Sequence, residues 1–154
     1  MSPVSPIPEN YPRITPYLCI DGAEAAIGFY IKVFGAVERM RLPTPDGKIA
    51  HAELAIGDGL IMVSDEFPDW GALAPGSIGG TPVTISIYVE DVDAAFAAAI
   101  EAGATSREPA KDQFYGDRSG QFTDPFGHRW MVASHIEDVS PDEIQARMAD
   151  EMGA

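Results

Sequence analysis

The sequence predicts an α+β protein in which two tandem βαβββ modules form a cup-shaped mixed sheet, followed by a C-terminal helix. The main observation is an internal repeat, because the pattern of residues 17–26 returns 69 residues later in residues 86–95. In both copies an apolar, strand-like stretch runs into an acidic turn and then an alanine-rich helical stretch. The last strands keep this spacing, since residues 61–64 lie 69 positions before residues 130–133. Two copies are too few for a solenoid and indicate one domain made of two similar halves.

The first module contains the elements of this pattern in order. The predicted elements are a strand over 14–20, a helix over 22–34, and strands over 37–42, 49–56 and 60–64. Asp21 is suited to cap the start of the helix and Gly35 to end it. Residues 44–47, Thr-Pro-Asp-Gly, are typical of a hairpin turn.

The second module repeats the order, and one further helix follows it. The predicted elements are a strand over 83–89, a helix over 92–102, and strands near 106–113, 119–122 and 129–134. Residues 140–143, Ser-Pro-Asp-Glu, combine a capping serine, a proline and two early acids, which is typical of a helix start.

These elements give the predicted domain organisation. We expect an N-terminal lead-in over 1–13, a single domain over 14–135 and a helical tail over 136–154. Within the domain, the modules span about 14–64 and 83–135, on either side of a glycine-rich linker over 65–82.

Composition excludes several classes of function. The chain has 24 acidic residues against 10 Lys and Arg, a formal net charge of −14, which argues against nucleic acid and permits a cationic ligand. No apolar run approaches the roughly 20 residues of a membrane span, and the proline-rich N-terminus lacks the pattern of a signal peptide. With the single Cys19, these features predict a cytoplasmic protein that binds neither nucleic acid nor a membrane.

Alternation along the strands separates an apolar face, under the helices, from a mixed face that would line the cup. The residues expected on the mixed face include Thr15, Tyr17, His51, Glu53, Met62, Thr84, Tyr88, Gln121 and Met131. Trp130 alternates with them and is expected in the core beneath the second helix.

Three stretches resemble the vicinal oxygen chelate superfamily, which includes glyoxalase I, extradiol dioxygenases and bleomycin-resistance proteins. They are the helix and its end over 23–36, the strand-to-helix junction over 89–93, and the Asp-Pro-Phe-Gly-His-Arg turn over 124–129. The resemblance covers about residues 14–134. It implies the duplicated fold and a homodimer with ligand grooves shared between subunits. Because this fold hosts unrelated chemistries and non-catalytic binders, it leaves the reaction open.

The family's metal enzymes take up to four His, Glu or Gln ligands from the cup, two from each module. Carrying that pattern over places Thr15, Met62, Thr84 and Met131 at the four positions. Hydroxyl and thioether groups are poor ligands for the divalent ions that prefer imidazole or carboxylate. We therefore expect no metal at the family positions and no cofactor, although a divalent metal bound elsewhere stays open.

His51 and Glu53 are the leading candidates for catalysis, because two residues that lie two apart on a strand point to the same face. They could act as an acid/base pair, ligate a differently placed metal, or form a hydrogen-bonded pair at the rim. Arg39 and Arg41, on the neighbouring strand, would serve the same place.

Residues 112–120 hold a second concentration of chemical groups. Phe114, Tyr115 and Arg118 combine aromatic faces with a fixed cation, which suits a planar or charged ligand. The alternative is a hairpin in which Asp117 pairs with Arg118. His128 and His135 are weaker candidates.

Three functions follow from these observations. The first is a non-catalytic protein, similar to bleomycin-resistance proteins, that binds a small aromatic or cationic molecule. The second is a glyoxalase-like lyase or isomerase with a displaced metal, and the third is a metal-free acid/base enzyme that uses His51 and Glu53. The sequence leaves open the identity of the ligand and whether the modules pair within one chain or between two.

Overall fold

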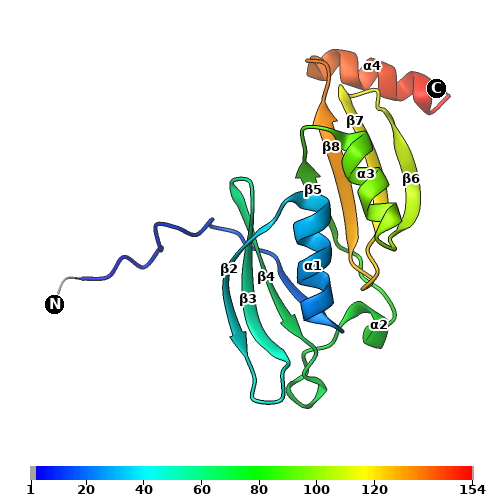
Figure 1. Ribbon diagram of the computed structural model, residues 1–154. Helices are drawn as coiled ribbons and strands as arrows, with labels where there is room; N and C mark the ends of the chain where they lie inside the picture. The colour runs from blue at the N-terminus through cyan, green and yellow to red at the C-terminus, as the bar shows by residue number, and fades with distance from the viewer. Residues whose placement is uncertain (1–2, 154) are drawn as a thin grey trace. The chain divides into compact units, whose positions relative to one another are not determined.

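A computed structural model describes residues 3–153, and the α+β fold of two βαβββ modules with a C-terminal helix is confirmed (Figure 1). The chain divides into two compact units at Gly79 and Gly80, inside the predicted linker. Unit 1 contains β1 (Tyr17–Ile20), α1 (Ala23–Phe34), β2 (Val37–Pro43), β3 (Ile49–Ile56), β4 (Gly59–Asp65), a 3-10 helix η1 (Pro68–Trp70) and α2 (Pro75–Ile78). Unit 2 contains β5 (Thr84–Tyr88), α3 (Val92–Glu101), β6 (Thr105–Asp112), β7 (Asp117–Thr123), β8 (Arg129–His135) and α4 (Pro141–Glu151).

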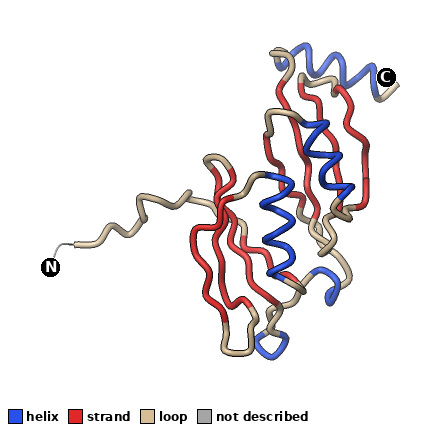
Figure 2. Tube along the Cα trace, viewed as in Figure 1, coloured by secondary structure: helices blue, strands red, loops and turns tan. Residues whose placement is uncertain are grey.

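Each unit has its own four-stranded mixed sheet with the same topology. The strand order is β1-β4-β3-β2 in unit 1 and β5-β8-β7-β6 in unit 2. The first strand of each unit runs parallel to the last, and the other neighbours are antiparallel. A parallel pair needs a crossover connection, and a helix supplies it in both units (Figure 2).

The core of each unit lies between its sheet and this helix. In unit 1 the largest fully buried side chains are Ile20, Ile27, Tyr30, Leu54 and Val63. In unit 2 they are Phe122, Trp130 and Val132, which confirms the core position predicted for Trp130. The opposite face of each sheet, called the mixed face from here on, carries the polar side chains discussed below.

The start of α1 differs from the prediction. The N-cap is Gly22, at φ 98°, and Asp21 makes no cap. The side chain of Asp65, at the end of β4, takes that role: its Oδ1 accepts hydrogen bonds from the backbone N–H of Ala23 at 2.8 Å and of Gly22 at 3.3 Å. A carboxylate from the neighbouring strand therefore satisfies the first turn of the helix. Ser140 caps α4 as predicted, by accepting from the N–H of Glu143 at 3.2 Å.

The alternation predicted for β3 fails at its first residues. With His51 and Glu53 on the mixed face, strict alternation would place Ala50 on the apolar face, but Ala50 is exposed and Ile49 is buried. The pairing of β2 with β3 is irregular here, because Leu42 pairs with His51 and Pro43 with Ile49. This bulge reverses the alternation before His51 and leaves the rest of the strand as predicted.

No helix within residues 3–153 is long and apolar enough to cross a membrane.

Candidate functional site

A continuous chain of hydrogen bonds crosses the mixed face of unit 1. The Tyr17 hydroxyl lies 2.6 Å from Nδ1 of His51, and Nε2 of His51 lies 3.0 Å from Oε2 of Glu53. The other carboxylate oxygen of Glu53 accepts a hydrogen bond of 2.8 Å from the Tyr11 hydroxyl. The structure thus brings together His51 and Glu53, as predicted, and adds a tyrosine at each end of the pair.

The sheet accounts for this arrangement. His51 and Glu53 alternate with the buried Ala52, so both side chains leave β3 on the mixed face. Tyr17 and Glu53 both pair with Met62 on the intervening strand β4, so Tyr17 lies two strands away at the same level. A tyrosine side chain is long enough to reach across β4 to the imidazole.

Glu53 is the buried centre of the chain, with 4% of its surface exposed. The hydrogen bond from His51 is the main cause that lowers the pKa of Glu53, the bond from Tyr11 adds to it, and burial opposes both. Its carboxylate is therefore held in the ionised form. The hydrogen bond between Tyr11 and Glu53 is also the main cause that raises the pKa of Tyr11.

The ionised carboxylate determines the protonation of the imidazole. A carboxylate only accepts hydrogen bonds, so Nε2 of His51 carries the proton, and in the neutral ring Nδ1 is left as an acceptor. Nδ1 can then accept the hydroxyl proton of Tyr17. Burial is the main cause that raises the pKa of Tyr17, which favours the neutral phenol. Chemically, the arrangement is an acid/base pair of tyrosine and histidine oriented by a carboxylate.

Apolar side chains surround this polar chain. On β2, Met40 and Leu42 pair with Glu53 and His51, and they are 37% and 50% exposed. Tyr17 is itself 53% exposed. Met62 lies half-buried between the first and third strands. The face therefore combines fixed polar groups with accessible apolar and aromatic surface.

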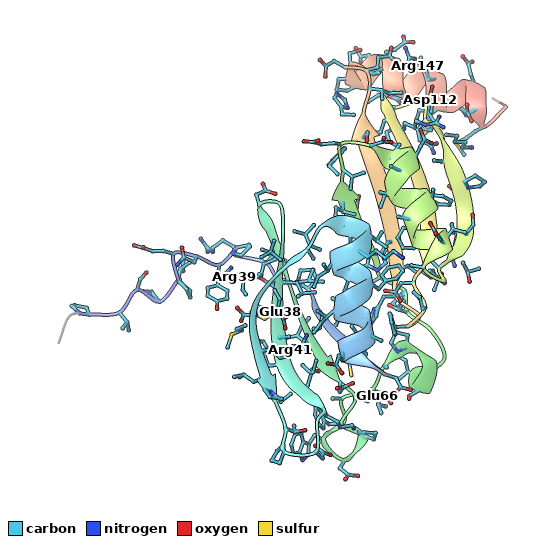
Figure 3. All side chains as sticks on the ribbon, viewed as in Figure 1. Glu38, Arg39, Arg41, Glu66, Asp112 and Arg147 are labelled. Carbon is cyan, nitrogen blue, oxygen red and sulfur yellow. The ribbon has the colours of Figure 1, made fainter. Side chains whose placement is uncertain are left out.

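The two arginines predicted for this site lie at different places. Arg39 lies beside the lead-in, where its Nη1 donates to the backbone carbonyl of Asn10 at 3.0 Å and its guanidinium lies 5.0 Å from the Tyr11 ring centroid (Figure 3). Arg41 binds Glu38 at 2.5 Å and Glu24 of α1 at 3.3 Å, on the helix side of the sheet. Arg39 thus joins the candidate site and Arg41 does not.

Unit 2 carries a different polar chain on its mixed face. Asp117, 8% exposed, accepts hydrogen bonds of 2.8 Å from the Tyr88 hydroxyl and from Nδ1 of His135. Nε2 of His135 lies 2.7 Å from Asp138, in the segment before α4. Asp138 is the main cause that raises the pKa of His135, and Asp117 adds to it.

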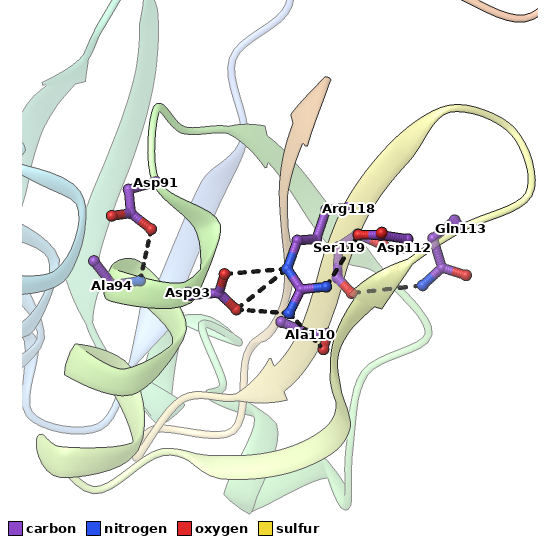
Figure 4. Close-up of polar contacts among 8 residues, drawn as sticks. All are labelled: Asp91, Asp93, Ala94, Ala110, Asp112, Gln113, Arg118 and Ser119. Carbon is purple, nitrogen blue, oxygen red and sulfur yellow. Dashed lines mark hydrogen bonds and ion pairs between the residues drawn. The ribbon is translucent and has the colours of Figure 1, made fainter. Parts of the chain in front are cut away.

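The other residues predicted for unit 2 are dispersed. Arg118 lies on the helix side of β7, where it binds Asp93 of α3 and Asp112 of β6, each at 3.0 Å (Figure 4). The alternative prediction, that Asp117 pairs with Arg118, is therefore wrong: Asp117 binds Tyr88 and His135, and Arg118 binds Asp93 and Asp112. Four of the predicted side chains remain on or near the mixed face. Gln121 and Met131 pair across β7 and β8, and Thr84 lies at the exposed start of β5. The hydroxyl of Tyr115 lies 3.5 Å from Ser119.

Phe114 belongs to another surface. With Arg147, Asp150 and Glu151 it lines an open groove of about 290 Å³ beside α4. The backbone carbonyl of Phe114 accepts a hydrogen bond of 3.2 Å from Arg147, which ties the turn before β7 to the last helix.

The residues at the family's metal positions do not fit a metal centre. In unit 1 these positions hold the half-buried Thr15 and Met62, and in unit 2 they hold Thr84 and Met131. Within residues 3–153 no group of three or more His, Cys, Asp or Glu side chains is placed to hold an ion. In the same residues, every buried side-chain nitrogen or oxygen has a hydrogen-bond partner, so no buried polar atom is left over for a cation to bind. The donor set therefore supports no chemistry through a metal at these positions.

Tyr11 was absent from the sequence prediction, and Asp117 entered it only as a possible partner of Arg118. Tyr11 lies in a proline-rich segment without periodicity, and no local pattern relates it to Glu53. Asp117 lay before the predicted start of its strand; extending the alternation from Gln121 back to Asp117 would have placed it on the mixed face.

Comparisons with known proteins agree with this architecture. The model of the Glyoxalase/Bleomycin resistance protein/Dioxygenase superfamily matches residues 12–132. The protein Mb0911c of Mycobacterium bovis is 46% identical over 143 residues, which cover 91% of this chain and 94% of that protein. Protein PA1353 of Pseudomonas aeruginosa is similar in structure with a TM-score of 0.69 and 28% identity, over 82% of this chain and 99% of that chain. TioX from Micromonospora sp. ML1 gives a TM-score of 0.64 and 29% identity, over 81% of this chain and 99% of that chain.

Proposed function

The chain belongs to the Glyoxalase/Bleomycin resistance protein/Dioxygenase superfamily, and we propose that it binds a small aromatic molecule on the mixed face of unit 1 without a metal. The observation that carries this proposal is the hydrogen-bonded chain through Tyr17, His51 and Glu53, set among exposed apolar side chains. Binding sites for small molecules typically combine apolar and aromatic surface with a few fixed polar groups.

The internal repeat argues that this polar chain serves function and not folding. Glu53 pairs with Met62, and at the equivalent place in unit 2 Gln121 pairs with Met131. By the same registers, Ser119 replaces His51 and Ser86 replaces Tyr17. Unit 2 forms the same sheet with two serines and a glutamine at these positions, and its own tyrosine, carboxylate and imidazole lie elsewhere on the mixed face. The fold therefore does not require the three groups at the positions they occupy in unit 1.

The exposed surface favours an aromatic ligand. Met40, Leu42 and the ring of Tyr17 offer apolar contact and a flat face for stacking. The formal net charge of −14 favours ligands that also carry a positive charge, through the long-range field of the protein.

The repeat also supplies the variant that tests the proposal. The triple variant Tyr17→Ser/His51→Ser/Glu53→Gln gives unit 1 the residues of unit 2 at these positions. We expect it to keep the wild-type amide spectrum away from the site but to lose binding of aromatic fragments. The measurement is chemical-shift mapping of EDTA-stripped protein with a library of aromatic and cationic fragments. The reverse variant Ser86→Tyr/Ser119→His/Gln121→Glu controls for general effects of three substitutions.

Two results would contradict the proposal. One is a set of fragment-induced shifts that stays unchanged in the triple variant. The other is saturable binding of Zn²⁺, Ni²⁺, Mn²⁺ or Fe²⁺ that is lost in His51→Ala and is required for the ligand to bind, because the metal-dependent alternative would then explain the site.

The geometry also favours a second candidate function, a metal-free acid/base enzyme. The observation is that the Tyr17 hydroxyl lies 2.6 Å from Nδ1 of an imidazole whose other nitrogen faces the Glu53 carboxylate. Tyr17 can pass its proton to Nδ1 of His51 as its oxygen takes a proton from the ligand, and the Glu53 carboxylate stabilises the resulting imidazolium. Ligands found in the fragment screen would then exchange acidic C–H protons for deuterium in D₂O. That exchange should be lost in Tyr17→Phe and unaffected by EDTA; a rate equal to that of buffer alone would rule out this function for the ligands tested.

A further inference from the structure

We propose that Tyr11 occupies a subsite for a phenolic ring, so that the ligand of unit 1 is a hydroxylated aromatic compound that displaces the lead-in. This inference rests on the proposed function and names the class of ligand. The subsite consists of Glu53 and Arg39, which hold the hydroxyl and the ring of Tyr11.

Tyr11 is held on the sheet by its side chain. Its hydroxyl donates to Glu53 at 2.8 Å, and its ring lies 5.0 Å from the guanidinium carbon of Arg39. Its backbone N–H instead bonds at 3.4 Å to the carbonyl of Pro8, within the lead-in. Tyr11 is half-buried, whereas the residues on either side of it, Asn10 and Pro12, are exposed. The tyrosine side chain is therefore docked much as a separate phenol would be, on a segment that otherwise faces solvent.

The chemistry of Glu53 determines what can replace Tyr11. The carboxylate is 4% exposed, and one of its oxygens is already bound to His51. When Tyr11 leaves, water can solvate the other oxygen, but an aromatic ring that takes the place of Tyr11 excludes this water, and an ionised oxygen left unpaired beneath such a ring is costly. A phenolic hydroxyl restores this bond, and an aromatic ring without a donor does not. A site built around a hydroxyl discriminates strongly against the analogue that lacks it.

Arg39 adds a preference for the ring. A guanidinium near an aromatic face attracts the electron-rich ring. Its hydrogen bond to the carbonyl of Asn10 connects the same cation to the lead-in, so displacement of Tyr11 also releases this contact.

The tethered tyrosine should act as an internal competitor. A group on a short flexible segment has an effective concentration in the millimolar range, so it weakens any ligand of similar intrinsic affinity. Removing it should therefore strengthen the binding of a free phenol.

The test uses 4-methylphenol, which reproduces the tyrosine side chain from its β-carbon outward, and isothermal titration calorimetry on the full chain treated with EDTA. We expect Tyr11→Ala to bind 4-methylphenol more tightly than the wild type by one plus the ratio of the effective concentration to the Kd, which is about tenfold for an effective concentration of about 1 mM and a Kd of about 0.1 mM. Toluene, which lacks the hydroxyl, should gain no affinity. Ile14→Ala is the matched control, because Ile14 lies in the same stretch of chain at 86% exposure and its loss should change nothing.

Two variants in the Tyr11→Ala background locate the subsite. Glu53→Gln should weaken the binding of 4-methylphenol by about fivefold or more, because the amide oxygen accepts a neutral hydrogen bond in place of a charge-assisted one. Because Gln121 occupies the equivalent position of unit 2, the sheet can accommodate this change. Arg39→Ala should weaken 4-methylphenol by about two- to fivefold.

The inference is overturned if Tyr11→Ala binds 4-methylphenol no better than the wild type, or if toluene gains as much affinity. The inference is also overturned if neither the wild type nor Tyr11→Ala binds 4-methylphenol saturably. These failures are distinct from failure of the proposed function, which is read from other aromatic fragments and the triple variant. Fragments that still map to Tyr17 and His51 would preserve the proposed function and remove only the phenolic subsite.

Discussion

Glu53→Gln should change the tautomer of His51. In the wild type, Nε2 of His51 lies 3.0 Å from the carboxylate of Glu53 and Nδ1 lies 2.6 Å from the Tyr17 hydroxyl. A proton on Nε2 satisfies both contacts, since the ring donates to the carboxylate and accepts from the phenol. A proton on Nδ1 would require the phenol to turn and would leave two acceptors facing each other at Glu53.

The size of the preference follows from the bond that the wrong tautomer loses. A hydrogen bond to a charged group contributes about 1.5–3 kcal/mol, so the Nε2–H form should exceed the other by about ten- to 150-fold. With a neutral glutamine the corresponding bond contributes about 0.5–1.5 kcal/mol, and the ratio falls to about two- to twelvefold. The glutamine can also rotate and donate through its amide nitrogen, which reduces the preference further.

The assay is two-dimensional NMR of the ring nitrogens in protein labelled with ¹⁵N-histidine. The sample is titrated upward in pH until the ring-nitrogen shifts of His51 stop changing, so that the neutral imidazole is observed. Averaged shifts report the ratio of the two forms, and His128 in the same spectrum is an internal control. A dominant Nδ1–H form in the wild type, or equal ratios in wild type and Glu53→Gln, would refute the hydrogen-bonded chain.

Three further predictions concern stability and titration. Asp124→Ala should lower the free energy of unfolding in urea by about 3 kcal/mol, because two backbone N–H groups and a buried indole N–H lose their acceptor. Asp124→Asn keeps one acceptor oxygen and should cost less, so equal losses in the two variants would contradict this. His135 should titrate by NMR above its usual pKa, and Asp138→Asn should lower that pKa. Because the folded-state pKa is raised, the bonds of His135 stabilise the protein at low pH, and their contribution is lost as the pH rises through that pKa. Gly116→Ala should cost more than about 3 kcal/mol, since its Cβ would clash with a backbone carbonyl, whereas Gly47→Ala, with the same sign of φ and open space, should cost about 1 kcal/mol; equal losses would contradict the clash.

The fold could be predicted because its signals are local and occur twice. Alternation along the strands, glycines after the helices and the spacing of the two copies all point to the same elements. The failures arose where a contact distant in sequence overrides a local preference. Asp21 is a good capping residue, but the carboxylate of Asp65 reaches the start of α1 from β4 and replaces it. At Ala50, an irregular pairing with β2 reverses the alternation.

The candidate site was predictable only in part, for the same reason. His51 and Glu53 share one strand, so their separation of two residues was sufficient to place them together. Tyr17 could be assigned to the correct face, but its bond to His51 depends on β1 lying next to β4. Tyr11 belongs to no strand, and its contact with Glu53 spans 42 residues of sequence.

The two polar chains show how one duplicated sheet can serve two purposes. In each unit a nearly buried carboxylate on the mixed face binds one tyrosine hydroxyl and one imidazole: Glu53 in unit 1 and Asp117 in unit 2. In unit 2 the imidazole continues to Asp138, so the chain holds the segment that leads to α4. In unit 1 the imidazole continues instead to the hydroxyl of Tyr17, a residue that is 53% exposed. Both chains include an accessible tyrosine, since Tyr88 is 67% and Tyr17 is 53% exposed. The difference lies in the imidazole, because both nitrogens of His135 face carboxylates, whereas Nδ1 of His51 faces a phenol that can exchange its proton with a ligand. On this ground we propose the chemistry for unit 1 and an anchoring role, at the segment before α4, for unit 2.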